Sequence, residues 1–361
     1  MLDVTEFGAD PAPESGDDAA AIRDAIAAAD SGDEVVLPPG TYDLKSTHPN
    51  DDSANLLLRS GVHLRGAGAS KTVLVTSFDG DDDSRVIRGA GVTDVIVADL
   101  TITSRHDGPL ADDPNDADAG GGPMYGIHLG PRDGRPSSHM LVEHVRVERF
   151  ERHGISAKAT REVTLADNHL ADATGVGPGG RGYGIAIEGT ADQRDPRAED
   201  DSRHNFVVGN RAGNALGNSG GKKHKHDASG EHNWVHGNTL KNNERGILVI
   251  LGTPDTVVED NDITAGDESM VGIEVRNGPG TIIRNNRISG GEGDFWAIRL
   301  REDDGADGRG RGVPRAVAVT DNRIQRSPNG IRIDAGDDIE LADNRLSDIG
   351  DTKVRGSDSV D

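Results

Sequence analysis

The sequence predicts an all-β protein built as a β-solenoid, in which short strands stack in successive coils. From about Val92 to Ile349, an alternating apolar strand leads to Asn, a turn, and then Gly-Ile opening a second alternating strand. Clear copies are VVEDNDI (257–263) with GIEV (272–275), TIIRNNRI (281–288) with AIRL (297–300), and AVTDNRI (318–324) with GIRI (330–333). A strand period of two within a repeat of about twenty-odd residues indicates a solenoid of strands.

The recurring Asn marks one corner of each predicted coil. Its positions are Asn168, Asn210, Asn238, Asn261, Asn286, Asn322 and Asn344. We expect each amide to hydrogen-bond its equivalent in the next coil, about 4.8 Å away. Asn also tolerates the left-handed backbone that sharp turns need, so these residues are predicted to be architectural.

Residues 17–29 (DDAAAIRDAIAAA) predict the chain's one amphipathic helix. Its apolar face would consist of Ala21, Ile22, Ala25, Ile26 and Ala29. Asp17 or Asp18 can cap its N-terminus. We expect this helix to cover the open end of the solenoid, because an uncovered strand edge invites aggregation.

The N-terminal text also resembles a known superfamily. VTEFGAD (4–10), the helix at 17–29, EVVLPPGTYDL (34–44) and HLRGAG (63–68) are similar to the opening of the pectin-lyase-like right-handed parallel β-helices. The resemblance implies an N-terminal strand and capping helix over 1–45, a single right-handed parallel β-helix over 46–350, and a polar tail over 351–361. Many members of this superfamily hold a polysaccharide in a groove along an outer sheet.

Composition narrows the setting. The net charge is −24, and only eight of the 39 basic residues are Lys. This Asp-rich, Lys-poor profile is typical of a halophilic, haloarchaeal-type protein. In molar salt the Debye length is roughly 3 Å, so the repulsion between its acidic residues is screened. A nucleic-acid partner is not expected, because phosphates would be repelled. The chain has no Cys, which excludes disulfides and Cys-based zinc sites.

The N-terminus lacks a basic region followed by an apolar run, so no signal peptide is predicted. No stretch approaches the roughly 20 apolar residues of a membrane span, so no membrane insertion is expected. These features fit a virion protein better than a conventionally secreted enzyme. An extracellular or virion surface is favoured over the cytoplasm.

Aligning the Gly-Ile strands predicts which residues face outward. The inward pairs would be Ile127/Leu129, Ile155/Ala157, Ile185/Ile187, Ile247/Val249, Ile273/Val275, Ile298/Leu300 and Ile331/Ile333. Alternation then places polar and charged residues outside, among them His128, Ser156, Lys158, Glu188, Glu274, Arg276, Arg299, Arg301, Arg332 and Asp334. Of these, Glu274, Arg276, Arg299 and Arg301 are candidate substrate-binding residues.

One stretch, residues 222–236, concentrates Lys and His. Three of the eight Lys and four of the 13 His of the chain fall there. Together with Glu188, it supplies the candidate catalytic residues Lys223, His224, Lys225, His226 and Asp227. Further candidates for substrate binding are Arg203, His204, His232 and His236.

Several chemistries fit this stretch. A Lys, His or Arg could abstract the C5 proton of a bound uronate, giving β-elimination or epimerisation. Glu188 and Asp227 could form a retaining glycosidase pair, with their carboxylates about 5 Å apart. A transition-metal site at the four His and a polar coil of mutually hydrogen-bonded His are further alternatives, and no metal residues are assigned. The Asp-rich runs are candidate Ca²⁺ ligands, although none has EF-hand spacing.

The sequence therefore predicts binding and processing of a polysaccharide along an outer sheet, by a lyase, epimerase or glycosidase. Signature motifs of polygalacturonases, alginate epimerases and pectate lyases are absent from the sequence. The alternatives are a non-catalytic glycan-binding spike or adhesin of a halophile virus, and a structural subunit. The expected partner is a polysaccharide or cell-surface glycan. A homotrimer is a candidate assembly, although no heptad segment is present.

Overall fold

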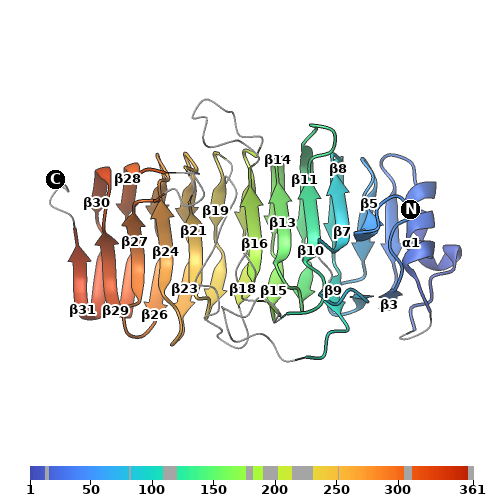
Figure 1. The fold of residues 1–361 in the computed structure, drawn as a ribbon, viewed down its shortest axis with the longest axis horizontal. Coiled ribbons are helices and arrows are strands. Elements are labelled where there is room, and N and C mark those ends of the chain that lie inside the picture. The colour runs from blue at the N-terminus through green and yellow to red at the C-terminus, as the bar shows by residue number, and fades with distance from the viewer. Residues whose placement is uncertain are drawn as a thin grey trace. The chain divides into compact units, whose positions relative to one another are not determined.

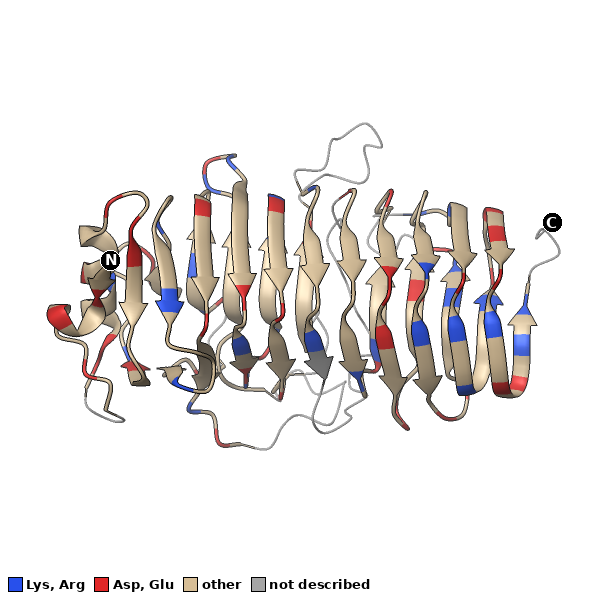
Figure 2. Ribbon diagram, turned by 180° about the vertical axis from the view of Figure 1, so that it is seen from behind, with Lys and Arg blue, Asp and Glu red and all other residues tan. Residues whose placement is uncertain are grey.

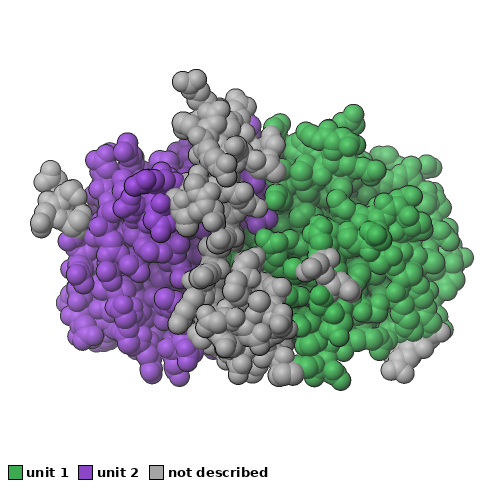
Figure 3. Space-filling model, viewed as in Figure 1, with its two compact units in different colours: residues 1–186, 221–224 green, residues 187–220, 225–361 purple. Residues whose placement is uncertain are grey.

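The computed structural model describes residues 1–12, 16–80, 83–108, 120–175, 182–189, 202–213, 231–250, 252–304 and 311–356. The chain forms two compact units, residues 1–186 with 221–224 (unit 1) and residues 187–220 with 225–361 (unit 2) (Figure 3). In each unit successive coils contribute strands to three parallel sheets (Figure 1). This confirms the predicted all-β parallel β-helix.

Unit 1 begins with a 3-10 helix η1 (Val4–Phe7) and the helix α1 (Ala19–Ala28), which packs beside the first strands (Figure 1). The apolar face of α1 is buried as predicted. Asp17 caps the helix by accepting the N–H of Ala19 at 3.2 Å, whereas the carboxylate of Asp18 accepts from Asp10 and Asp43 instead. No described helix is long and apolar enough to cross a membrane.

The strands of unit 1 form three sheets. The first contains β1 (Leu2–Asp3), β2 (Glu34–Leu37), β5 (His63–Gly66), β8 (Thr93–Ala98), β11 (Ser137–Glu143) and β14 (Thr160–Ala166). The second, which we name the β4–β16 sheet, contains β4 (Ala54–Leu57), β7 (Arg85–Ala90), β10 (Tyr125–Gly130), β13 (His153–Lys158) and β16 (Tyr183–Glu188). The third contains β3 (Gly40–Leu44), β6 (Thr72–Thr76), β9 (Thr101–Ser104), β12 (Arg146–Glu148) and β15 (His169–Ala171).

Unit 2 repeats the pattern. The β17–β30 sheet contains β17 (Phe206–Val208), β19 (Trp234–His236), β22 (Val257–Glu259), β25 (Ile282–Arg284), β28 (Arg315–Thr320) and β30 (Asp337–Ala342). The β21–β29 sheet contains β21 (Arg245–Val249), β24 (Val271–Arg276), β27 (Trp296–Arg301) and β29 (Arg323–Ile333). The third sheet contains β18 (Arg211–Gly213), β20 (Thr239–Lys241), β23 (Asp262–Ala265), β26 (Arg287–Gly290) and the first half of β29, and β31 (Arg345–Arg355) pairs along β29.

The core of each coil is aliphatic, and the predicted inward residues are buried in every coil except that of β16. In β16, Ile185 and Ile187 are half-buried, whereas Ala186 and Glu188 are buried, so the predicted alternation is wrong there. Strand β31 also continues to Arg355, past the predicted start of the tail at residue 351.

The predicted amide ladder exists in unit 2. The side-chain amide of each Asn donates to the next Asn Oδ1 at 2.9–3.0 Å, through Asn210, Asn238, Asn261, Asn286, Asn322 and Asn344. The left-handed residue is the one before each ladder Asn, not the Asn itself. Asp260, Asn285, Asp321 and Asp343 have φ of 53–56°, and Gly209 and Gly237 occupy the equivalent position in two coils. At each corner, therefore, one residue adopts the left-handed turn conformation and the following Asn forms the ladder hydrogen bonds.

Candidate functional site

The Gly-Ile phrase determines which side chains reach the outer face of the β4–β16 and β21–β29 sheets. A Cβ placed on Gly272 would lie 3.0 Å from the core atom Ile288 Cγ2 and 2.6 Å from the carbonyl oxygen of Ala297. The Gly position therefore points inward, as the following Ile does, and has little room for a side chain. Consequently the residue before Gly and the residue after Ile both face outward, three positions apart.

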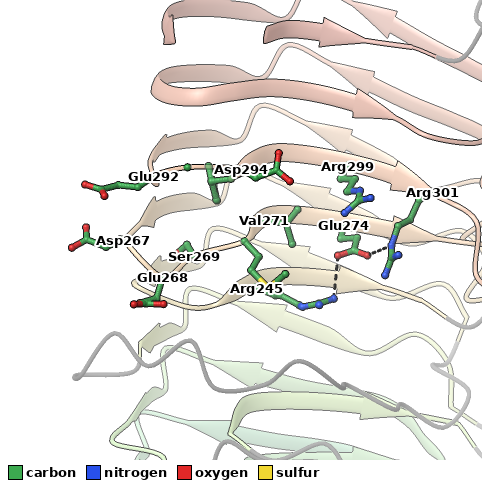
Figure 4. A pocket seen from close by; sticks show the side chains of 13 residues that line it. Arg245, Asp267, Glu268, Ser269, Val271, Glu274, Glu292, Asp294, Arg299 and Arg301 are labelled. Carbon is green, nitrogen blue, oxygen red and sulfur yellow. Dashed lines mark hydrogen bonds and ion pairs between the residues drawn. The ribbon is translucent and has the colours of Figure 1, made fainter. Parts of the chain in front are cut away.

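In unit 2 this rule builds a cluster around Glu274 of β24. Arg245 of β21 reaches Glu274 Oε2 through Nη1 at 3.3 Å, and Arg301 of β27 reaches Oε1 through Nε at 2.6 Å (Figure 4). Arg276 pairs with the same carboxylate from within β24. Glu274 is only 2% exposed, because these guanidinium groups cover it.

The charge state of Glu274 follows from this environment. Burial alone would raise its pKa, but Arg276, Arg301 and Arg245 outweigh burial and lower the pKa of Glu274 to about 2. The carboxylate is therefore ionised at any physiological pH. It can orient guanidinium groups, and it cannot act as a general acid.

A cleft of about 460 Å³ opens beside this cluster, and we name it the guanidinium cleft. Its lining includes Arg245, Glu274, Arg299 and Arg301 from the strands. Figure 4 shows the acidic residues Asp267, Glu268, Glu292 and Asp294 on its other side. Met270, Val271 and Phe295 add apolar surface. Basic, acidic and apolar groups thus meet in a space large enough for a small ligand.

Basic residues exceed acidic ones on the strand side of the cleft. The arginines that line it there are Arg245, Arg299 and Arg301, and the one carboxylate beside them among the described residues is Glu274. Arg299 Nε lies 2.7 Å from Asp334 Oδ2, yet the side chains of Arg299 and Arg301 remain 28% and 32% exposed. Both can reach a ligand while keeping their internal partners.

Basic ladders are not confined to this sheet. Figure 2, which views the molecule from behind, shows basic residues recurring on neighbouring strands of unit 2. In the third sheet Arg287, Arg323 and Arg345 stand in register, and all three are exposed. What distinguishes the guanidinium cleft is therefore its concave shape and buried carboxylate, not the presence of arginine alone.

The structure divides the predicted substrate-binding residues between sheets. Glu274, Arg276, Arg299 and Arg301 come together in the β21–β29 sheet. Arg203, His204, His232 and His236 lie in or next to strands of the β17–β30 sheet. There the ring of His204 stacks on His232 at 5.3 Å, and Arg203 Nε lies 3.6 Å from Glu231 Oε1. The predicted site centre, residues 222–236, lies largely outside the described residues, so one site flanked by Glu188, Glu274, Arg276, Arg299 and Arg301 stays a prediction.

The predicted catalytic residues Lys223, His224, Lys225, His226 and Asp227 lie outside the described residues. Glu188 ends β16 and is 3% exposed. The distance between Glu188 and Asp227, on which the glycosidase hypothesis depends, is therefore untested, and these residues stay predictions.

Sequence reasoning missed a cluster on the β4–β16 sheet. The rings of Tyr125 and His128 contact at 4.8 Å between centroids, Tyr125 meets His153 at 5.4 Å, and His153 meets Tyr183 at 5.4 Å. Tyr125, His153 and Tyr183 each directly precede the Gly of a Gly-Ile pair. The sequence did carry a signal for this cluster, in the phrases YGI (125–127), HGI (153–155) and YGI (183–185). Strict alternation counted from the Ile places the aromatic residue of each phrase inside, so the prediction missed it.

Comparison with known proteins places the chain among proteins of one architecture. A family model described as Rhamnogalacturonase A/epimerase, pectate lyase-like, matches residues 1–105, and one described as Periplasmic copper-binding protein (NosD) matches residues 188–349. No curated protein sequence matches the chain.

Solved structures match along nearly the whole chain. The mannuronan C-5 epimerase AlgE4 A-module of Azotobacter vinelandii is 19% identical, with a TM-score of 0.63 over 98% of this chain and 97% of that one. The Streptococcus pneumoniae adhesin PfbA is 17% identical, with a TM-score of 0.69 over 98% and 99%. The tailspike of E. coli bacteriophage HK620, solved with a pentasaccharide, is 12% identical, with a TM-score of 0.62 over 99% and 65%. At these identities the likeness establishes the fold alone.

One group among the described residues has the spacing of metal ligands. His236 Nδ1 lies 3.7 Å from Glu259 Oε1 and 3.5 Å from Asp260 Oδ2. Both oxygens of Glu259 are already engaged, one by Trp234 Nε1 at 2.8 Å and the other by Arg284. Copper prefers imidazole or sulfur ligands, and this group offers a single imidazole beside a cation. This group therefore does not fit a copper site.

Proposed function

We propose that the chain binds an acidic polysaccharide along the β21–β29 sheet, with the guanidinium cleft as a binding subsite. Its parallel β-helix fold and the pectate lyase-like family model matched over residues 1–105 support this proposal. Proteins of the same fold include a mannuronan C-5 epimerase, a surface adhesin and a tailspike solved in complex with a pentasaccharide. The alternatives of a processing enzyme and a non-catalytic glycan binder share this first step.

The observation that carries the proposal is the buried Glu274 carboxylate, which pairs with three guanidinium groups. It anchors Arg245 and Arg301, so that the charges on the strand side of the cleft are held in place before a ligand arrives. The side chains of Arg299 and Arg301 are partly exposed, and a guanidinium group can bind a uronate carboxylate in a bidentate arrangement. The acidic residues opposite can accept hydrogen bonds from sugar hydroxyls.

A processing step that needs a general acid requires a group other than Glu274, since its lowered pKa keeps the carboxylate ionised. The predicted residues Lys223, Lys225, His224, His226, Asp227 and Glu188 remain the candidates for a lyase, epimerase or glycosidase step. A glycan partner also fits an extracellular or virion surface, and a trimer remains a candidate assembly.

Retention on immobilised polysaccharides tests the binding step. Arg299→Ala combined with Arg301→Ala should weaken retention on uronate polymers by about tenfold or more. Arg323→Ala is the matched control, because this exposed arginine belongs to a ladder on another sheet. Equal retention of the double variant and the control would refute the proposal. Assays of unsaturated products and reducing ends on the same polymers distinguish an enzyme from a binder.

A further inference from the structure

A second cluster of charged and polar groups lies on unit 1, on the β4–β16 sheet. His128 stands in register between Arg88 of β7 and Ser156 of β13. We call the His128 cluster the group formed by Arg85, Arg88, Tyr125, His128, Arg152, Ser156 and Lys158. It shares no residue with the guanidinium cleft.

The position of His128 is fixed by its neighbours. Its ring contacts Tyr125, and a Cβ on Gly130 would lie 2.9 Å from His128 Nε2. The imidazole therefore lies along its own strand, over the space that Gly130 leaves. Arg152 Nη1 donates to the hydroxyl of Tyr125 at 3.0 Å, which ties a third element of the cluster to the same ring.

The surroundings of His128 keep it uncharged. Burial is the largest cause and the cations Arg85, Arg88, Lys158 and Arg152 add to it, lowering the pKa of His128 to about 3. A neutral imidazole offers one donor and one acceptor. Beside several cations, it is a hydrogen-bonding group for a hydroxyl rather than a further positive charge.

Among the described residues, Arg85 Nε and Arg152 Nε of this cluster are buried without a hydrogen-bond partner. Two more such atoms come from neighbouring strands. They are His128 Nδ1 and the hydroxyl oxygen of Ser156, which is 0% exposed and stands opposite His128 in the next strand. Leaving such atoms unpaired is costly, so their presence in neighbouring strands calls for a partner that brings hydrogen-bonding groups of its own.

The cations of the cluster differ in how far they are neutralised. Arg85 pairs with Asp83 and Arg88 pairs with Asp51. Arg152 has the Tyr125 hydroxyl as its hydrogen-bond partner and no carboxylate among the described residues. Arg152 therefore keeps its full charge available in a protein whose net charge is −24.

We propose that the His128 cluster is a second binding site, which takes a single sugar acid residue. Arg152 and Lys158 bind the carboxylate, and neutral His128 with Ser156 exchanges hydrogen bonds with an adjacent ring hydroxyl. The assignment of the ligand as a residue of an acidic polysaccharide rests on the proposed function. The site itself rests on the geometry of unit 1.

Titration with oligogalacturonate, measured by calorimetry, tests this site. Arg152→Gln should lower affinity by about tenfold, because it removes the positive charge that no carboxylate of the described residues neutralises. Ser156→Ala, a small change at a buried position, should lower affinity by about threefold. The matched control is Arg161→Gln in β14, which lies outside the cluster. Affinity unchanged by both Arg152→Gln and Ser156→Ala would overturn the proposal.

Two further arms separate the causes. Affinity at this site should stay constant between pH 5 and 8, whereas a loss as pH rises would mean that a protonated His128 binds the ligand and would overturn its neutral role. Free galacturonic acid should bind if the site takes one sugar acid, and binding of the oligomer alone would overturn that stoichiometry.

The Arg299→Ala and Arg301→Ala variant distinguishes the two proposals. If it retains binding that Arg152→Gln then abolishes, the His128 cluster stands and the cleft fails. If it abolishes all binding while Arg152→Gln has no effect, the cleft stands and the His128 cluster fails. Melting curves of each variant verify that the fold is retained.

Discussion

The β4–β16 sheet of unit 1 and the β21–β29 sheet of unit 2 follow the same backbone rule, but their central side chains differ in charge. Both place outward residues on either side of a Gly-Ile pair. At the centre of one stands His128, and at the centre of the other stands Glu274, each surrounded by cations. Burial, with the cations adding to it, lowers the pKa of His128 and leaves the histidine neutral. The cations lower the pKa of Glu274 against the effect of burial and leave the glutamate ionised.

The two clusters differ in how far their cations are paired with a carboxylate. In unit 2 the central carboxylate takes up three guanidinium groups, so the cluster is internally paired. In unit 1 the central group carries no charge, and Arg152 keeps its own. The same arrangement of strands therefore gives a braced cleft in one unit and a cationic face in the other.

The comparison depends first on the inward register of the Gly-Ile pairs. Ile127→Asp in unit 1 and Ile273→Asp in unit 2 should each lower the free energy of unfolding by more than about 4 kcal/mol, since each buries an unpaired charge. Ile282→Asp, at a half-buried position of β25, is the control and should cost far less. Chemical denaturation measures all three, and a soluble Ile273→Asp protein of unchanged stability would show the register to be wrong.

Acid should affect the two clusters in different pH windows. Glu274 has a folded pKa of about 2 against an ordinary 4.5, so its contribution, about 3 kcal/mol, is present above pH 4.5 and is lost as pH falls toward 2. For His128 the ordinary pKa is 6.5 and the folded pKa about 3, so the loss begins below pH 6.5. Hydrogen exchange should show protection of unit 1 falling first.

Single substitutions isolate the two windows. His128→Asn should remove the stability loss between pH 6.5 and 3, and Glu274→Gln should remove the loss below pH 4.5. Glu274→Gln should also destabilise at neutral pH by about 3 kcal/mol, because it leaves buried guanidinium groups without a carboxylate. Superimposable acid profiles for the parent and both variants would contradict a neutral His128 and an ionised Glu274.

Substitutions in the amide ladder should lower stability less, and the cost should grow with the number of ladder hydrogen bonds that each substitution removes. Asn261→Ala breaks bonds to both Asn238 and Asn286 and should cost about 2 kcal/mol. Asn344→Ala removes the last member of the ladder, bonded to Asn322 on one side, and should cost less. Thermal melting compares the two, and an equal cost would mean that the ladder contributes through each corner alone.

Salt concentration should change the stability of both units together, so it should have the smallest effect on the difference between them. If the net charge of −24 reflects high-salt adaptation, the melting temperature should fall when KCl is reduced below about 0.2 M, where screening weakens. A melting temperature that is the same in low and molar KCl would exclude that interpretation.

The sequence predicted the parts of this molecule that repeat. Alternation located Ile273 in the core and Glu274 on the outer face, and spacing located the amide ladder. It could not show that Glu274 is buried, because the arginines that cover it come from three strands. It also missed Tyr125, because the inward turn of Gly126 breaks the alternation on which the prediction relied.

The ladder has a consequence for how such a molecule can change over generations. Asn286 and Asn322 are 36 residues apart, and Asn322 and Asn344 are 22 apart, yet both amide bonds measure 2.9 Å. Loop length is thus uncoupled from the register of the coils. New segments can be grafted between corners without redesigning the scaffold, so a lineage or an engineer can vary what the surface recognises while inheriting the same frame.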